Sequence, residues 1–217
     1  MSRMLPFTTE QFFSVFADYN ESVWPMQWLL TLLAVGIVLL TISRTPWRDR
    51  AICLLLASLW AWMAIAYHLL HFSTINPAAY VFAGVFLVQA ALFLWWTISN
   101  RALMPAFRRD LKSWIAAGIL TFALILYPIL SASLGHAYPF APTFGVPCPS
   151  TIFTLGVLTA ARAPRIAILF IAPLAWSVVG GSAAFLLGVW PDLGLIVSAI
   201  TAAALLGFGW QKARIQL

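Results

Sequence analysis

Seven apolar segments, separated by short polar links, restrict the folds that are open to this chain. Their approximate bounds are Trp24 to Ser43, Ala51 to Phe72, Ala78 to Ser99, Trp114 to Gly135, Pro149 to Ala161, Ile166 to Gly188 and Gly194 to Trp210. Six of them have about the 20 residues that a helix needs to cross a bilayer. Of all residues, 63% are hydrophobic and only 8% are charged. A water-soluble domain of this size could not bury so many hydrophobic residues in one core. The sequence therefore predicts an all-α integral membrane protein, with residues 1–217 as a single domain and residues 24–210 as a seven-helix bundle.

The basic residues predict the orientation of this bundle. Eleven of the 12 lysines and arginines follow the first, third, fifth and seventh segments, and only Arg3 lies on the other side. Since cytoplasmic links carry an excess of lysine and arginine, we expect the N-terminus outside the cytoplasm and residues 211–217 inside as a tail. The formal charge of +6 is then a topology signal, and no nucleic-acid partner is expected.

The fifth segment is shorter than the others. Its thirteen residues would form a helix of about 20 Å, whereas the hydrocarbon core is about 30 Å thick. The preceding stretch, His136 to Cys148, is too rich in proline to form a regular helix. Irregular backbone at membrane depth persists only where protein buries it or where it lines a wet cavity. We therefore expect a partly membrane-inserted loop that floors a pocket open to the outer side.

The first 23 residues carry a helix signal of their own. Thr8 and Gln11 stand at the spacing of a capping box. Phe12, Phe16 and Tyr19 then recur at helical spacing, opposite acidic residues. These features predict an amphipathic helix on the outer surface, which either covers the mouth of the pocket or anchors the chain at the interface.

Histidine and cysteine side chains gather at the predicted outer level. His68 and His71 lie one helical turn apart at the outer end of the second segment. His136 opens the proline-rich loop, and Cys148 ends it. Imidazole and thiolate groups are ligands of zinc and copper, so these four residues form a candidate transition-metal site. Their spacing matches no established metal motif, and interfacial histidines also serve simply as hydrogen-bonding groups.

Cys148 supports a second, enzymatic interpretation. It lies just before the fifth helix, where unsatisfied N–H groups and the helix dipole favour a thiolate. A nucleophilic or redox thiol at this position would need a base, and His136 or His68 is the candidate. A buried, inert cysteine is the alternative.

Further side chains are expected to line the same pocket. Gln89 falls at the middle of the third segment, where it either pairs with another helix or floors the pocket. Aromatic walls with a few polar contacts are typical of ligand sites. The predicted ligand-binding residues are therefore the four above and Tyr67, Tyr138, Gln89 and Trp60, with Tyr127 and Trp176 as additional walls.

The absence of charged residues from the predicted segments argues against several functions. No Asp, Glu, Lys or Arg falls inside a predicted segment, whereas proton pumps, ion-coupled carriers and voltage sensors normally place one there. Asp192 is expected on the outer side, in the link before the last segment, where it, Asp18 and Glu21 are the carboxylates near the histidines and Cys148. Because Lys112 and Lys212 lie at the cytoplasmic surface, a retinal Schiff base is excluded. The chain also lacks the nucleophile, nucleotide and kinase motifs of soluble enzymes.

Small residues recur at every fourth position in the last two segments. They are Gly180, Ala184 and Gly188, and then Ala199, Ala203 and Gly207. Small residues at this spacing let helices approach closely. They predict packing inside the bundle or a homo-oligomer interface on the sixth and seventh helices.

Two stretches of the chain resemble a known family. They are Pro6 to Phe13, with Tyr19-Asn20 and Trp24-Pro25 after it, and Gly145 to Thr151. Both are similar to a bacterial multipass membrane family of unknown function, and the resemblance covers nearly the whole chain. The expected location is the bacterial inner membrane, and the resemblance supplies no activity.

The sequence leaves three functions open. The leading hypothesis is an outward-facing pocket that binds a small molecule or a soft metal ion, for uptake or sensing. The first alternative is a membrane-embedded enzyme that uses Cys148 with a nearby histidine. The other is a structural subunit of a membrane complex.

Overall fold

The computed structural model describes residues 5–99, 103–105, 107–163 and 165–215, and only the backbone of residues 208–215. Within these residues the regular structure is helical, apart from an isolated bridge between Phe144 and Val146. The α-helices are α1 (Thr9–Ser22), α2 (Met26–Ile42), α3 (Arg48–Trp62), α4 (Ala79–Ile98), α5 (Leu111–Thr121), α6 (Tyr127–Ser133), α7 (Pro147–Ala160), α8 (Ala167–Leu186) and α9 (Leu193–Ile215). Two π-helical segments, η1 (Met63–Leu69) and η3 (Phe122–Leu126), and two 3-10 turns, η2 (Phe72–Thr74) and η4 (Trp190–Asp192), complete the chain. The expected all-α class is confirmed.

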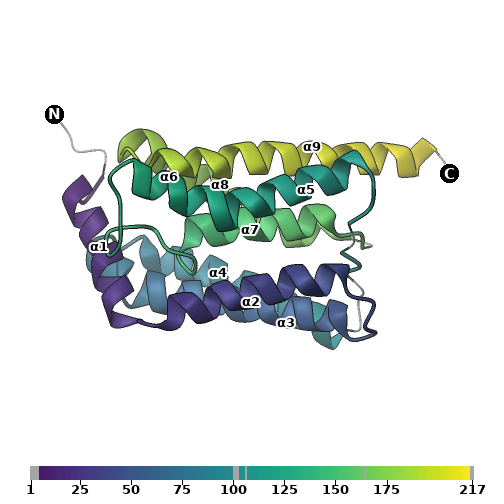
Figure 1. Ribbon diagram of the computed structural model, residues 1–217, viewed down its shortest axis with the longest axis horizontal. Helices are drawn as coiled ribbons and strands as arrows, with labels where there is room; N and C mark the ends of the chain where they lie inside the picture. The colour runs from purple at the N-terminus through teal and green to yellow at the C-terminus, as the bar shows by residue number, and fades with distance from the viewer. Residues whose placement is uncertain (1–4, 100–102, 106, 164, 216–217) are drawn as a thin grey trace.

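The helices form a bundle that is elongated along one axis (Figure 1). In this view α2 and α3 lie on one side of α7, and α5 and α9 lie on the other. Helix α1 lies across one end of the bundle, and α1 and α2 meet at 87°. The links that follow α2, α4 and α7 lie at the opposite end, as does the C-terminus.

Five helical stretches of the described chain are long and apolar enough to cross a membrane. They are Arg48–Thr74, Ala79–Ile98, Leu111–Ser133, Ala167–Leu186 and Trp190–Gly207. The bent pair α1 and α2 passes the same test only if it is taken as one span, which would make six. Helix α7 is apolar but has only 14 residues. The chain thus has five or six candidate spans, and the expected seven crossings stay a prediction.

Helix α7 lies at the centre of the bundle, and all 14 of its residues are buried. The indole N–H of Trp60 in α3 donates to the hydroxyl of Thr154 at 3.0 Å. On another side, a Cβ at Gly156 would lie only 2.9 Å from the side chain of Leu120 in α5, so the two helices pack closely there. A short helix is tolerated in this place because its neighbours, and not lipid, surround it.

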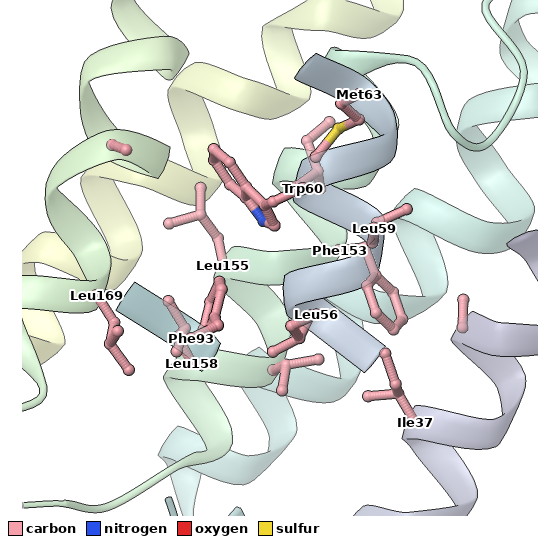
Figure 2. Packing of buried hydrophobic residues seen from close by; sticks show 14 of the residues in the cluster. Ile37, Leu56, Leu59, Trp60, Met63, Phe93, Phe153, Leu155, Leu158 and Leu169 are labelled. Atoms are coloured by element: carbon pink, nitrogen blue, oxygen red, sulfur yellow. The ribbon is translucent and has the colours of Figure 1, made fainter. Parts of the chain in front are cut away.

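The core around α7 draws on helices from both halves of the chain, and Figure 2 shows part of it. Gln89 of α4 donates from its amide nitrogen to the carbonyl of Leu169 in α8 at 3.1 Å. This pairing with another helix is one of the two roles expected for Gln89. The labelled core residues are Ile37 of α2, Leu56, Leu59 and Trp60 of α3, Met63 of η1, Phe93 of α4, Phe153, Leu155 and Leu158 of α7, and Leu169 of α8.

The small residues of α8 pack inside the bundle in part. A Cβ at Gly180 would lie 2.9 Å from Leu195, and one at Gly181 would lie 2.6 Å from Ile196, both in α9. Ala203 and Gly207 of α9 are instead exposed. The α8 stripe therefore serves packing within the chain, and an interface between copies of the chain stays a prediction.

Hydrogen bonds and an ion pair stabilise the end of the bundle that carries the basic links. Asp110 caps α5, because its carboxylate accepts from the backbone N–H of Ser113 at 2.8 Å. The hydrogen bonds from the Ser113 side chain and backbone lower the pKa of Asp110 below its ordinary value. Arg162, after α7, lies 3.3 Å from the same carboxylate, and Lys112 donates to the carbonyl of Ala161 at 2.9 Å.

Candidate functional site

Helix α1 closes the end of the bundle opposite the basic links. The expected capping box is present: the N–H of Gln11 donates to the Thr8 hydroxyl at 3.2 Å, and the N–H of Thr8 donates to the Gln11 side chain at 2.8 Å. Phe12, Phe16 and Tyr19 are buried, as their helical spacing predicts. They pack against the bundle itself, so α1 covers protein surface.

Asn20 joins α1 to the proline-rich loop. Its amide nitrogen donates to the carbonyls of Pro139 at 2.6 Å and Ala141 at 2.8 Å, and its amide oxygen accepts from the hydroxyl of Thr143 at 2.6 Å. The Asn20 side chain is fully buried. Proline-rich backbone cannot satisfy its carbonyls in a helix or sheet, so a side-chain amide serves them.

A tight turn at Gly145 brings this loop to the start of α7. Gly145 has a φ of +106°, and a Cβ at this position would overlap Leu30 and lie 3.1 Å from the hydroxyl of Tyr19. That hydroxyl accepts from the indole N–H of Trp62 at 2.7 Å. The N–H of Gly145 donates to the hydroxyl of Ser150 at 3.0 Å. Only glycine combines this φ with so close an approach.

A cavity of about 160 Å³, here called the α1 cavity, lies beneath α1. Its lining is mostly aromatic and aliphatic, and its polar groups come from residues of the bundle. The residues that matter for its chemistry are Phe7, Phe12 and Phe16 on the α1 side and Tyr67, Cys148 and Trp176 on the bundle side. This cavity lies at the start of α7, with α1 over it, and the outward-open ligand pocket expected there stays a prediction. Cys148 lines it but is only 8% exposed.

Asp192, which was expected in a link on the outer side, is buried. The η4 turn carries it into the bundle, where it is 1% exposed and accepts a hydrogen bond from the Tyr127 hydroxyl at 2.5 Å. The thiol of Cys148 lies beside the same carboxyl group and beside the indole of Trp176. The Asp192 carboxyl group therefore stands beside Cys148, near which it was expected, and its burial is what the sequence did not predict.

The two π-helical segments place two tyrosines near this carboxyl group. Segment η1 ends α3 and carries Tyr67, while η3 leads directly to Tyr127. Tyr67 and Tyr127 both lie near Cys148 and Asp192. Single-turn π segments in helices are frequent at functional sites. Their local sequences are ordinary apolar stretches, so nothing in them signalled the wider turn.

The three histidines and Cys148 do not form a common cluster. His68 is fully buried, and neither ring nitrogen has a hydrogen-bond partner. The side chains around it are aromatic, with ring centroids 4.7 Å away at Phe86 and 5.1 Å away at Trp176. His71 points elsewhere, because the helix ends at Leu69 and His71 lies in the turn before η2.

His71 and His136 have structural partners instead. The Nδ1 atom of His71 lies 2.6 Å from the carbonyl of Ala66, and Nε2 lies 2.9 Å from the hydroxyl of Ser22. His136 stacks on Phe13 of α1, with ring centroids 4.0 Å apart. Within the described part of the chain, no group of three or more His, Cys, Asp and Glu side chains is close enough to hold a metal ion. The structure therefore does not assemble the expected metal site.

The remaining predicted ligand residues are dispersed. Tyr67 lines the α1 cavity, whereas Trp60 is fully buried in the core beside α7. Gln89 is also fully buried, and its amide oxygen has no partner. Tyr138 is 53% exposed and packs against Trp24 at a ring-centroid distance of 6.2 Å. Of the predicted set, Tyr67, Cys148 and the expected wall residue Trp176 line this cavity.

The family DUF6064, a family of unknown function, matches residues 9–216. The chain belongs to DUF6064. No curated protein sequence and no solved structure matches it. In this DUF6064 member, the first of the two stretches that carried the expected resemblance forms α1 with its cap and Asn20, and the second forms the Gly145 turn and the start of α7.

Proposed function

We propose that this protein is a multipass protein of the bacterial inner membrane that binds a small molecule in the α1 cavity, for uptake or sensing. It would cross the bilayer seven times, with α1 on the outer side and the C-terminus in the cytoplasm. The excess of lysine and arginine after α2, α4 and α7 supports this orientation. Helix α7 can count as a crossing although it is short, because the surrounding helices bury all of its residues and keep the backbone at its ends away from lipid.

The lining of the α1 cavity carries the proposed binding function. Trp176 is part of this lining, and the only neighbour of its buried indole N–H among the described polar groups is the thiol of Cys148, a weak acceptor. A buried donor with only a weak partner costs free energy, which a bound oxygen acceptor would recover. An apolar cavity of roughly 150 Å³ can hold a molecule the size of benzene. The ligand that fits best is therefore a small apolar molecule with an oxygen acceptor.

Two neighbouring residues of α8 provide a matched test. Val179 lines the cavity, whereas Val178 does not and is 76% exposed. In purified protein, small aromatic ketones should raise the melting temperature of the wild type and of Val178→Trp. They should have no effect on Val179→Trp, whose indole fills the cavity. Equal responses of the two variants would contradict binding at this site.

The other interpretations receive less support from the described residues. The metal ligands expected from the sequence are dispersed, so the proposal is limited to a small molecule. The enzymatic alternative paired Cys148 with His136 or His68, but the polar neighbours of Cys148 are Asp192 and Trp176. No contact in the described part of the chain favours a thiol nucleophile activated by histidine.

A further inference from the structure

A second cavity, of about 360 Å³, lies on the side of the bundle between α2 and the η3–α6 stretch. The proline-rich loop closes its end nearest α1. The lining residues used below are Trp24, Gln27, Trp28 and Thr31 at the start of α2, Tyr127 of α6, and Tyr138 of the loop. We call this cavity the α2 groove. It is separate from the α1 cavity, and nothing below depends on ligand binding there.

Gln27 leaves one buried acceptor in the wall of the α2 groove without a partner. Its amide nitrogen donates to the backbone carbonyl of Asn20 at 2.6 Å and lies 3.4 Å from the Asn20 side-chain oxygen. Both of these neighbours are acceptors, so they fix which end of the amide is the nitrogen. The Gln27 oxygen is buried and has no hydrogen-bond partner, and the whole residue is only 7% exposed. A molecule in the groove would satisfy this oxygen by offering a donor.

Other polar groups of the groove already have partners. The Tyr127 hydroxyl donates to Asp192, and the Thr31 hydroxyl donates to the carbonyl of Gln27 at 2.8 Å. The hydroxyl of Thr143 donates to Asn20. Among the buried side-chain polar atoms of the described lining residues, the Gln27 oxygen is therefore the one without a partner.

The surface on both sides of the groove is of the kind that lipid covers. On α2, Trp28 is 63% exposed and Leu32 is 64% exposed. Across the groove, Ile125 and Ile129 are 53% and 58% exposed. Trp24 and Tyr138 pack together at the end of the groove nearest α1, and such aromatic side chains are typical of the headgroup level. An acyl chain can thus lie between α2 and α6 with its headgroup beside Gln27.

Charge around the groove selects among headgroups. Among the described residues that line it, none is basic. The exposed face of α1 carries Asp18 and Glu21, and Glu21 is three residues from Trp24. A cationic donor is therefore favoured over an anionic headgroup. We propose that the α2 groove binds a zwitterionic phospholipid with a primary ammonium headgroup, which donates an N–H to the Gln27 oxygen.

The test compares lipids that differ only in the headgroup. Native mass spectrometry of the purified full chain would measure binding of phosphatidylethanolamine, phosphatidylcholine and phosphatidylglycerol with identical acyl chains. Choline has no N–H donor, so phosphatidylethanolamine should bind about threefold to tenfold more tightly, the effect of one hydrogen bond. In Gln27→Met, which keeps the size of the side chain, this preference should disappear.

Gln27→Met also loses the hydrogen bond to Asn20, so a folding defect could remove the preference in this variant. A second variant therefore tests the groove without changing Gln27. Thr31→Trp fills the groove one helical turn further along α2 and leaves the Gln27 amide in place. It should abolish the preference, whereas Leu32→Trp, at an exposed position outside the groove, should keep it. Equal binding of the ethanolamine and choline lipids to the wild type would overturn the proposal. A preference that persists in Thr31→Trp, or glycerol lipid bound as tightly as ethanolamine lipid, would do so as well.

Discussion

Replacing Asn20 with alanine should release α1 and the proline-rich loop from each other. The side chain makes three hydrogen bonds of 2.6 to 2.8 Å to the loop, and each contributes about 0.5–1.5 kcal/mol net. Water can replace some of these bonds, because Pro139 and Ala141 are only half-buried. We therefore expect a loss of about 2–3 kcal/mol in the free energy of local opening, which corresponds to roughly 30- to 150-fold more opening.

Hydrogen exchange of the backbone amides measures this opening directly. In Asn20→Ala, exchange should accelerate in α1 and in residues 136–146 together, because the two segments share the lost bonds. Thr8→Ala is the matched control: it removes the cap of α1, costs about 1 kcal/mol and should affect only the first turn. If exchange in the loop is unchanged in Asn20→Ala, or if α1 opens no more than in Thr8→Ala, Asn20 does not hold the two segments together.

Three further predictions test other parts of the molecule. A topology reporter fused after Leu217 should be active only in the cytoplasm, and one inserted near Ala141 only outside; a C-terminal signal from outside would refute the seven-crossing proposal. Asp110 has a lowered pKa, so its carboxylate stabilises the fold above its ordinary pKa of 3.8 and this contribution is lost as the pH falls below that value. Melting temperatures measured from about pH 6 to about pH 3 should therefore fall less steeply in Asp110→Asn than in the wild type. Gly145→Ala should destabilise the protein by about 1–3 kcal/mol, because φ is +106° and the added Cβ has no room. Gly135→Ala, at a φ of +90° with open space around it, should cost less in the same thermal denaturation assay.

Local signals in the sequence were sufficient to predict α1. The cap at Thr8 and Gln11 and the spacing of Phe12, Phe16 and Tyr19 depend on residues within two turns of each other. The surface that α1 covers is formed by distant segments, so the sequence left two interpretations open. The contact of Asn20 with the proline-rich loop spans about 120 residues of chain, and no periodicity could indicate it.

The candidate site was predictable only in part, because its geometry depends on how helices turn. Cys148 was expected at a pocket beside the fifth segment, and it lines the α1 cavity. The pairing of His68 with His71 assumed a regular α-helix through both residues, but the helix ends at Leu69, before His71. Asp192 is the one charged residue of a short link, and its hydrogen bond with the distant Tyr127, which accompanies its burial, has no local signal.

The complete burial of α7 has a consequence for how the protein is made. A helix that leaves the translocon alone must partition into lipid on its own hydrophobicity, but α7 carries Ser150, Thr151, Thr154 and Thr159 on its surface. Thr154 contacts Trp60 of α3 and Ser150 contacts the Gly145 turn, but α8 and α9 also pack against α7, so its burial is complete only after both have been synthesised. Biogenesis should therefore depend on the last third of the chain, and ribosome-bound intermediates that end before α8 should hold α7 in a protease-sensitive, unassembled state.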